Sequence, residues 1–151
     1  FFFDTYHLLF LDGLVAGCDT EIAGIAAKAA KEVRYHLRHS RGWVIRLGDG
    51  TEESHARMQK ALDDCAPCVP ELFETDGTYL ELEDQNIVPD IQLLKAEWEC
   101  QMNQALGEAT LQMPEITHAM SGGRQGLHSE HLGYLLAEMQ FLQRAYPGAS
   151  W

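Results

Sequence analysis

The sequence predicts an all-α protein, and three observations along its 151 residues support that prediction. Apolar side chains recur at spacings of three and four, which places them on one face of a helix. Capping residues and Gly or Pro stop signals separate these stretches. No segment shows the polar and apolar alternation of a half-buried strand, and no internal repeat is evident. We therefore expect one helical domain over residues 1–151.

The first two helices are expected over residues 2–17 and 21–47, because both carry apolar rows at helical spacing. Asp19 and Thr20 lie between them and offer a cap for the second helix. The Gly-Asp-Gly of residues 48–50 predicts its end, where glycine favours a left-handed backbone. The chain begins inside an amphipathic pattern, without Met or a capping residue, so we expect it to be truncated at its N-terminus.

A third helix is expected over residues 52–64, with Thr51 as its cap. Pro70 suits the first turn of a short helix over residues 70–76. The Asp-Gly-Thr of residues 76–78 then predicts a loop.

The fourth long helix is expected over residues 90–111. Residues 112–127 contain Pro114 and paired glycines and predict an ordered loop. The last helix is expected over residues 128–145, before the Pro-Gly of residues 147–148. Its inward-facing side chains are predicted to be Leu132, Leu135, Met139 and Leu142.

Composition and charge exclude several classes of function. The formal net charge of −12 argues against binding to nucleic acid or to an anionic membrane, since both are themselves negative. No apolar run approaches the roughly 18 residues that a membrane-spanning helix needs. The four cysteines form no dense framework, and no signal peptide is visible, so we expect a soluble protein of the cytoplasm.

The second predicted helix carries polar residues within an apolar row. The row has steps of three and four and consists of Ile25, Ala29, Glu32, His36, Ser40, Trp43 and Leu47. Glu32 and His36 are therefore predicted to point inward, as are Asp4 and His7 on the first helix. Inward carboxylates and imidazoles are typical of di-iron carboxylate bundles. Tyr35 stands where a Glu-x-x-His ligand pair would have its His, so a hydrogen-bonded polar cluster and a bound metal both remain open.

Other short motifs favour structural or surface roles. The Cys65 to Cys68 spacing matches a redox motif or half a zinc site, but it lies at a helix end and lacks a second pair, which favours packing. The remaining candidates are the pairs Glu52 with His55, Glu115 with His118, and His128 with His131, and the Gly-rich segment 122–126. The two Glu-x-x-His pairs are interpreted as surface residues, and the His pair is interpreted as the opening of a helix, where neutral caps are common. The Gly-rich segment lacks the features of a phosphate loop.

A basic row lies on the opposite face of the second predicted helix. Its members are Lys31, Arg34, Arg38 and Arg41. The row has two interpretations: a solvated face, or docking onto acidic surface within the chain or on a partner.

Two long stretches resemble one known family. Residues 25–54, IAAKAAKEVRYHLRHSRGWVIRLGDGTEES, and residues 122–151, GGRQGLHSEHLGYLLAEMQFLQRAYPGASW, are similar to the C-type subunit of bacterial ring 1,2-phenylacetyl-CoA epoxidases, also called phenylacetate-CoA oxygenases. The similarity covers almost the whole chain and begins partway into the family pattern. The chain thus resembles the C-terminal part of such a subunit.

The resemblance implies a ferritin-like helical bundle that acts as a non-catalytic structural subunit, without catalytic residues or a cofactor of its own. It implies the catalytic A-type subunit as partner, with di-iron in that partner, NADPH acting through a reductase, and phenylacetyl-CoA as substrate in phenylacetate catabolism. Asp4, His7, Glu32 and His36 would then line a vestigial pocket, and Cys65 and Cys68 would occupy positions that are usually apolar or aromatic. The alternative is a ferritin-like protein with its own di-iron site, and a free-standing helical interaction module is a third possibility.

Overall fold

The structure, a computed structural model, describes residues 1–150. Seven α-helices and three short 3-10 helices follow one another in these residues. No residue from 1 to 150 belongs to a β-strand, which confirms the predicted all-α class. The chain divides into two compact units, Phe1–Met120 and a second unit that begins at Ser121. The prediction of one domain over residues 1–151 stays a prediction.

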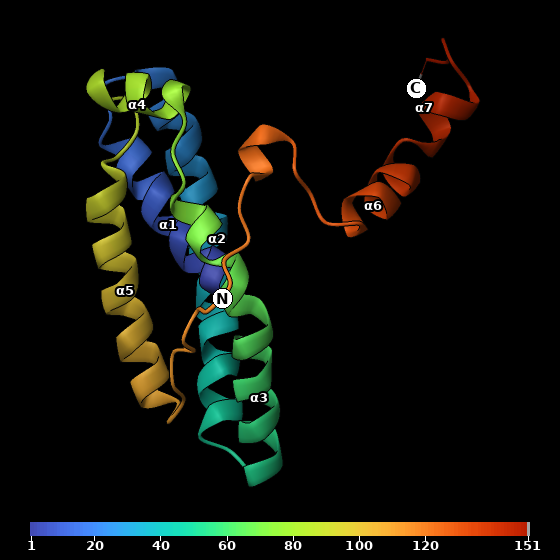
Figure 1. The fold of residues 1–151 in the computed structure, drawn as a ribbon. Helices are drawn as coiled ribbons and strands as arrows, with labels where there is room; N and C mark the ends of the chain where they lie inside the picture. The colour runs from blue at the N-terminus through green and yellow to red at the C-terminus, as the bar shows by residue number, and fades with distance from the viewer. Residues whose placement is uncertain (151) are drawn as a thin grey trace. The chain divides into compact units, whose positions relative to one another are not determined.

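A long antiparallel hairpin forms the centre of the first unit (Figure 1). It consists of α1 (Phe2–Val15) and α2 (Thr20–Gly48). The Asp19 carboxylate caps α2, because its Oδ1 accepts hydrogen bonds of 3.0 Å from the backbone N–H groups of Glu21 and Ile22. The predicted cap is therefore confirmed.

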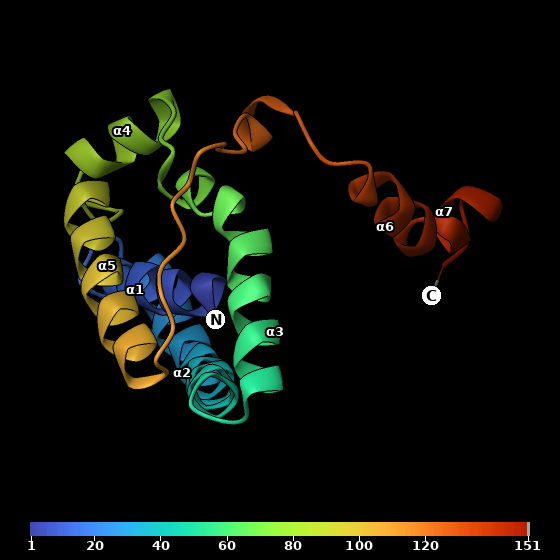
Figure 2. The same cartoon turned by 60° about the horizontal axis from the view of Figure 1, so that its bottom comes forward.

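Helices α3 and α5 lie on either side of this hairpin (Figure 2). The first of them, α3 (Glu52–Cys65), begins with a capping box in which Thr51 and Ser54 exchange hydrogen bonds, as the predicted Thr51 cap required. The second, α5 (Ile91–Glu108), packs against both α1 and α2. The first unit is therefore built around these four helices.

The connection between α3 and α5 is more helical than predicted. It contains η1 (Ala66–Cys68), η2 (Pro70–Phe73) and α4 (Gly77–Asp84). The predicted loop at residues 76–78 is wrong, because Asp76 accepts a 2.8 Å hydrogen bond from the Tyr79 N–H and so caps α4. Aspartate and glycine suit both a turn and a helix start, and the local pattern did not separate the two.

Gly48 is required for close packing, not for a left-handed turn. It lies inside α2, and the following Asp49 has a φ of −89°, so the predicted left-handed end of this helix is wrong. A Cβ added at Gly48 would lie 2.5 Å from the Ala109 carbonyl oxygen and 2.7 Å from Cδ1 of Leu111. Only glycine lets the end of α2 approach the end of α5 this closely.

The core of the first unit consists of three clusters of buried apolar residues. One lies at the end of α2 with α3 and α5, one between α1 and α2, and one around Trp98 of α5. The buried members of the first cluster are Val44, Leu62, Leu106, Ala109 and Leu111. Those of the second are Leu11, Ala26, Ala30 and Val33, and those of the third are Val69, Trp98 and Met102. The small alanines of α2 allow α1 to pack closely against it.

The second unit contains η3 (Gly123–Gln125), α6 (His131–Met139) and α7 (Phe141–Ala145). The predicted single helix over residues 128–145 is therefore two helices, separated at Gln140, where φ is −100° and ψ is 2°. No helix within residues 1–150 combines the length and apolar character that crossing a membrane requires.

Candidate functional site

Helix α2 buries a different face from the one predicted. Its buried row is Ala26, Ala30, Val33, Val44 and Gly48. In the predicted row, Ile25 is 71% exposed and Trp43 is 47% exposed, and Glu32 and His36 are exposed as well. The predicted inward orientation of Glu32 and His36 is thus wrong for the described residues.

The physical reason is that two rows of α2, offset by about one residue, both have helical spacing. The alanine row is wholly apolar, whereas the other row contains a carboxylate and an imidazole. Burying unpaired polar groups costs free energy, so α1 packs on the alanine row and leaves the mixed row outside. Spacing alone did not distinguish the two rows.

Asp4 and His7 on α1 are half-buried, unlike Glu32 and His36. The Ser40 hydroxyl donates a 2.6 Å hydrogen bond to Oδ2 of Asp4. The His7 ring lies beside Phe3, with 5.1 Å between ring centroids. Asp4 therefore takes part in a polar contact between α1 and α2, in keeping with the polar-cluster interpretation.

These residues do not fit a di-iron centre. Such a site needs several carboxylates and two histidines that converge from facing helices. Within residues 1–150, no group of three or more His, Cys, Asp or Glu side chains is placed to hold a metal ion. Asp4 is engaged by Ser40, while Glu32 and His36 are on the exposed face of α2. No step of an iron reaction is therefore assigned to them.

An aromatic ladder on α2 was missed by the sequence analysis. The Tyr35 ring stacks on His39 with 6.4 Å between centroids, and His39 meets Trp43 edge-on at 6.4 Å. The guanidinium carbons of Arg38 and Arg46 lie 5.4 and 5.6 Å from the Tyr35 and Trp43 ring centroids. The spacing of four between Tyr35, His39 and Trp43 is the sequence signal that could have predicted these ring contacts.

The basic row is partly engaged within the chain. Arg34 lies 3.2 Å from Asp12 of α1, and Arg41 lies 2.8 Å from Glu108 of α5. Arg34 and Arg41 therefore contact acidic residues of the same chain, which was one of the predicted alternatives. Both pairs are substantially exposed, so each contributes less than about 1 kcal/mol.

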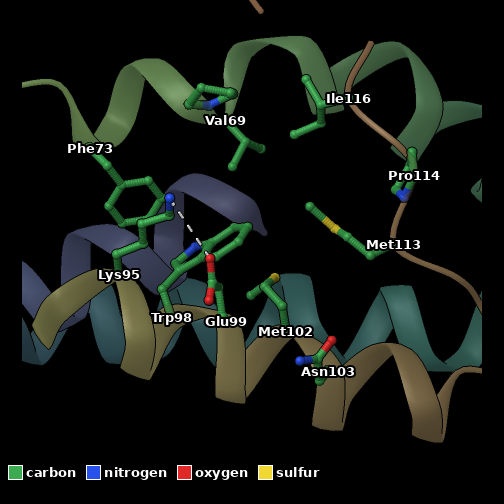
Figure 3. A pocket seen from close by; sticks show the side chains of 11 residues that line it. Val69, Phe73, Lys95, Trp98, Glu99, Met102, Asn103, Met113, Pro114 and Ile116 are labelled. Carbon is green, nitrogen blue, oxygen red and sulfur yellow. Dashed lines mark ion pairs between the residues drawn. The ribbon is translucent and has the colours of Figure 1, made fainter. Parts of the chain in front are cut away.

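A pocket of about 380 Å³ lies between α5 and the segment that follows α3 (Figure 3). Trp98 and Met102 of α5 face Val69 and Phe73 across it, and Met113 closes one side. The Trp98 ring is fixed because its Nε1–H donates a 3.0 Å hydrogen bond to the Phe2 carbonyl oxygen. The pocket is lined by the buried residues of the core cluster around Trp98 and connects that cluster with the surface.

The second unit exposes a row of apolar side chains on α6. Leu135 is 55% exposed, Leu136 36% and Met139 65%, and Leu132 is half-buried. The predicted inward orientation of Leu135, Met139 and Leu142 is therefore wrong within this unit. The spacing of positions 132, 135, 136 and 139 is that of one face of an amphipathic helix.

The two Glu-x-x-His pairs lie at the surface, as predicted, apart from His55, and the His128 and His131 pair is exposed as well. Exposed members are Glu52, Glu115, His118, His128 and His131. The half-buried His55 has its Nδ1 2.7 Å from the Gly48 carbonyl oxygen and so links α3 to the end of α2. Cys65 and Cys68 are exposed free thiols, so the predicted role in packing is wrong for their side chains.

Comparison with known proteins gives one consistent result. The family described as "Phenylacetic acid catabolic protein" matches residues 1–151. The chain is also 44% identical over 151 residues to the C-type subunit of the 1,2-phenylacetyl-CoA epoxidase of Escherichia coli (strain K12). That alignment covers 100% of this chain and 61% of the relative, so the chain spans less than two thirds of the relative's length. Its helical architecture is the ferritin-like fold of this family, and the chain belongs to the phenylacetic acid catabolic protein family.

Proposed function

We propose that this chain acts in a non-catalytic structural subunit of a multicomponent di-iron oxygenase that epoxidises phenylacetyl-CoA. Its role is to bind and support the catalytic A-type subunit of the same enzyme. The proposal rests on the family membership and on the name of the relative, one subunit of an epoxidase. The observation that carries the non-catalytic role is the unsuitable donor set, in which Glu32 and His36 are exposed and Asp4 is held by Ser40.

The cofactors then belong to the partners of this chain. Di-iron held by the A-type subunit would supply the oxygen chemistry, and a reductase would pass electrons from NADPH. Both components are cytoplasmic in this proposal, as is the chain. This chain would contribute a rigid helical surface, which its three core clusters and capped helices support.

Two surfaces are candidates for the contact with the A-type subunit. The first is the apolar row on α6, whose exposure is typical of a helix that packs on another protein. The second is the basic row on α2. Within residues 1–150, Lys31 and Arg38 form no ion pair with a carboxylate, so their charges remain available to an acidic partner.

Co-purification tests the proposal. The chain would be co-expressed with the A-type subunit, and assembly would be measured by size-exclusion chromatography with light scattering. We expect a stable complex in which only the A-type subunit binds iron. Stoichiometric iron in the isolated chain would instead support the alternative of a ferritin-like protein with its own di-iron site.

A further inference from the structure

The two thiols of the Cys-x-x-Cys segment line one common hollow at the end of α3. Cys65 ends α3 and directly precedes η1, so it lies three residues before Cys68. Side chains at i and i+3 are aligned in a 3-10 turn. Ala66 and Val69, the next pair with this spacing, are 1% and 5% exposed. That pair lies on the inner face of the turn, whereas Cys65 and Cys68 are both exposed and line the same hollow.

A third sulfur atom is held at this turn by the distant residue Met120. The Met120 N–H donates a 2.8 Å hydrogen bond to the Pro67 carbonyl oxygen, within the Cys-x-x-Cys segment itself. The Met120 Sδ lies 3.4 Å from the Cys68 Sγ. A backbone contact and a side-chain contact therefore place the Met120 thioether beside the Cys68 thiol.

An apolar wall borders the two thiols. Cys65 and Cys68 both line one hollow of about 290 Å³, together with Val69 and Leu72. Both thiols are free and exposed, so a ligand reaches them from solvent. Packing does not account for this arrangement, because exposed cysteines bury little apolar surface.

We propose that Cys65, Cys68 and Met120 form a binding site for Cu(I). Thiolate and thioether sulfur are soft ligands, and soft ligands select Cu(I) among the common biological cations. Binding replaces two S–H bonds with two Cu–S bonds and releases two protons to solvent, while the Met120 thioether donates a lone pair. The copper enters and stays as Cu(I), so no oxidant or reductant takes part.

The donor set disfavours zinc, the other metal that Cys-x-x-Cys motifs bind. Structural zinc sites use four Cys, His or carboxylate ligands in a tetrahedron. Within residues 1–150, no third Cys, His, Asp or Glu joins these two thiols in a possible metal site. A thioether as third ligand suits Cu(I), for which low coordination numbers are sufficient.

Competition for copper tests the site. The reduced chain would be titrated with Cu(I), kept reduced by ascorbate, against the coloured chelator bicinchoninate. We expect one tightly bound Cu(I) per chain. Cys65→Ser and Cys68→Ser should each abolish this binding, and Met120→Leu should weaken it by about tenfold or more. Cys18→Ser and Cys100→Ser are matched controls, because they remove exposed thiols from elsewhere in the chain.

Three results would overturn the assignment. The first is unchanged copper binding in the Cys65→Ser, Cys68→Ser double variant with normal helix content by circular dichroism. The second is equally tight binding of Zn(II) at the same thiols. The third is a wild-type chain that forms a Cys65–Cys68 disulfide under the ascorbate conditions and takes up no copper.

Discussion

Ser40 of α2 donates a 2.6 Å hydrogen bond to Oδ2 of Asp4 on α1, which fixes the register of the antiparallel hairpin at its open end. At the other end of the same interface, Leu11 packs among the alanines of α2. The polar contact and the apolar cluster together align the two helices from Asp4 to Leu11 of α1.

Removing this hydrogen bond should destabilise the hairpin. Ser40→Ala leaves a half-buried carboxylate oxygen without its donor, so we expect a loss of about 1–2 kcal/mol in the free energy of unfolding, measured with urea. Arg34→Ala is the control, because its ion pair with Asp12 is exposed and should cost less than about 1 kcal/mol. If Ser40→Ala and Arg34→Ala lowered the free energy of unfolding equally, the hydrogen bond from Ser40 to Asp4 would contribute no more than an exposed ion pair.

Gly48 should not tolerate a side chain. A Cβ at this position would meet the Ala109 carbonyl oxygen at 2.5 Å, so we expect Gly48→Ala to destabilise the chain by about 1–3 kcal/mol. Gly24 and Gly42 lie on the same helix with no atom within 4 Å of an added Cβ. Their alanine variants should be neutral or stabilising by about 0.5–1 kcal/mol. Thermal melts measure all three variants, and a Gly48→Ala chain that melts higher than the Gly24→Ala and Gly42→Ala chains would contradict the prediction.

Glu32 and His36 should be dispensable for stability and for turnover. Both side chains are exposed, so Glu32→Gln and His36→Asn are expected to change the free energy of unfolding by less than about 0.5 kcal/mol. Turnover by a complex assembled with either variant should equal that of the wild-type complex. A loss of orders of magnitude in a fully assembled Glu32→Gln complex would contradict the structural role and favour a catalytic one.

The basic row should act through assembly. Reversing Lys31, Arg34, Arg38 and Arg41 to Glu is expected to weaken binding to the A-type subunit, and the effect should shrink as salt is added. Arg57→Glu on α3 is the control, because the Arg57 side chain is highly exposed and pairs with Glu53 one turn away on the same helix. Binding that is unchanged at low salt would exclude the row from the interface.

The apolar row on α6 should promote association. Leu135→Ser with Met139→Ser removes two exposed anchors, so we expect weaker binding to the A-type subunit and less aggregation of the isolated chain. Leu93→Ser changes an exposed leucine of the first unit and serves as the control. Light scattering would measure both effects, and similar results for the two variants would argue against a specific role of α6.

Local sequence signals determined the helices and most of their starts. Asp19 and Thr51 cap α2 and α3 as predicted, because a cap involves only the next two or three backbone N–H groups. The all-α class followed from spacing in the same way. The family could also be recognised from the sequence, because long stretches of this chain can be compared residue by residue with the family's own sequences.

Tertiary packing decided what spacing left open. Both rows of α2 fit a helix, and only the approach of α1 selected the row that contains Ala26 and Ala30, which left Glu32 outside. The need for glycine at position 48 comes from Ala109, more than sixty residues away in the chain. Likewise, Met120 meets Cys68 only because the chain returns to the end of α3. Such relationships depend on contacts between distant segments, whereas caps and helical periodicity are properties of neighbouring residues.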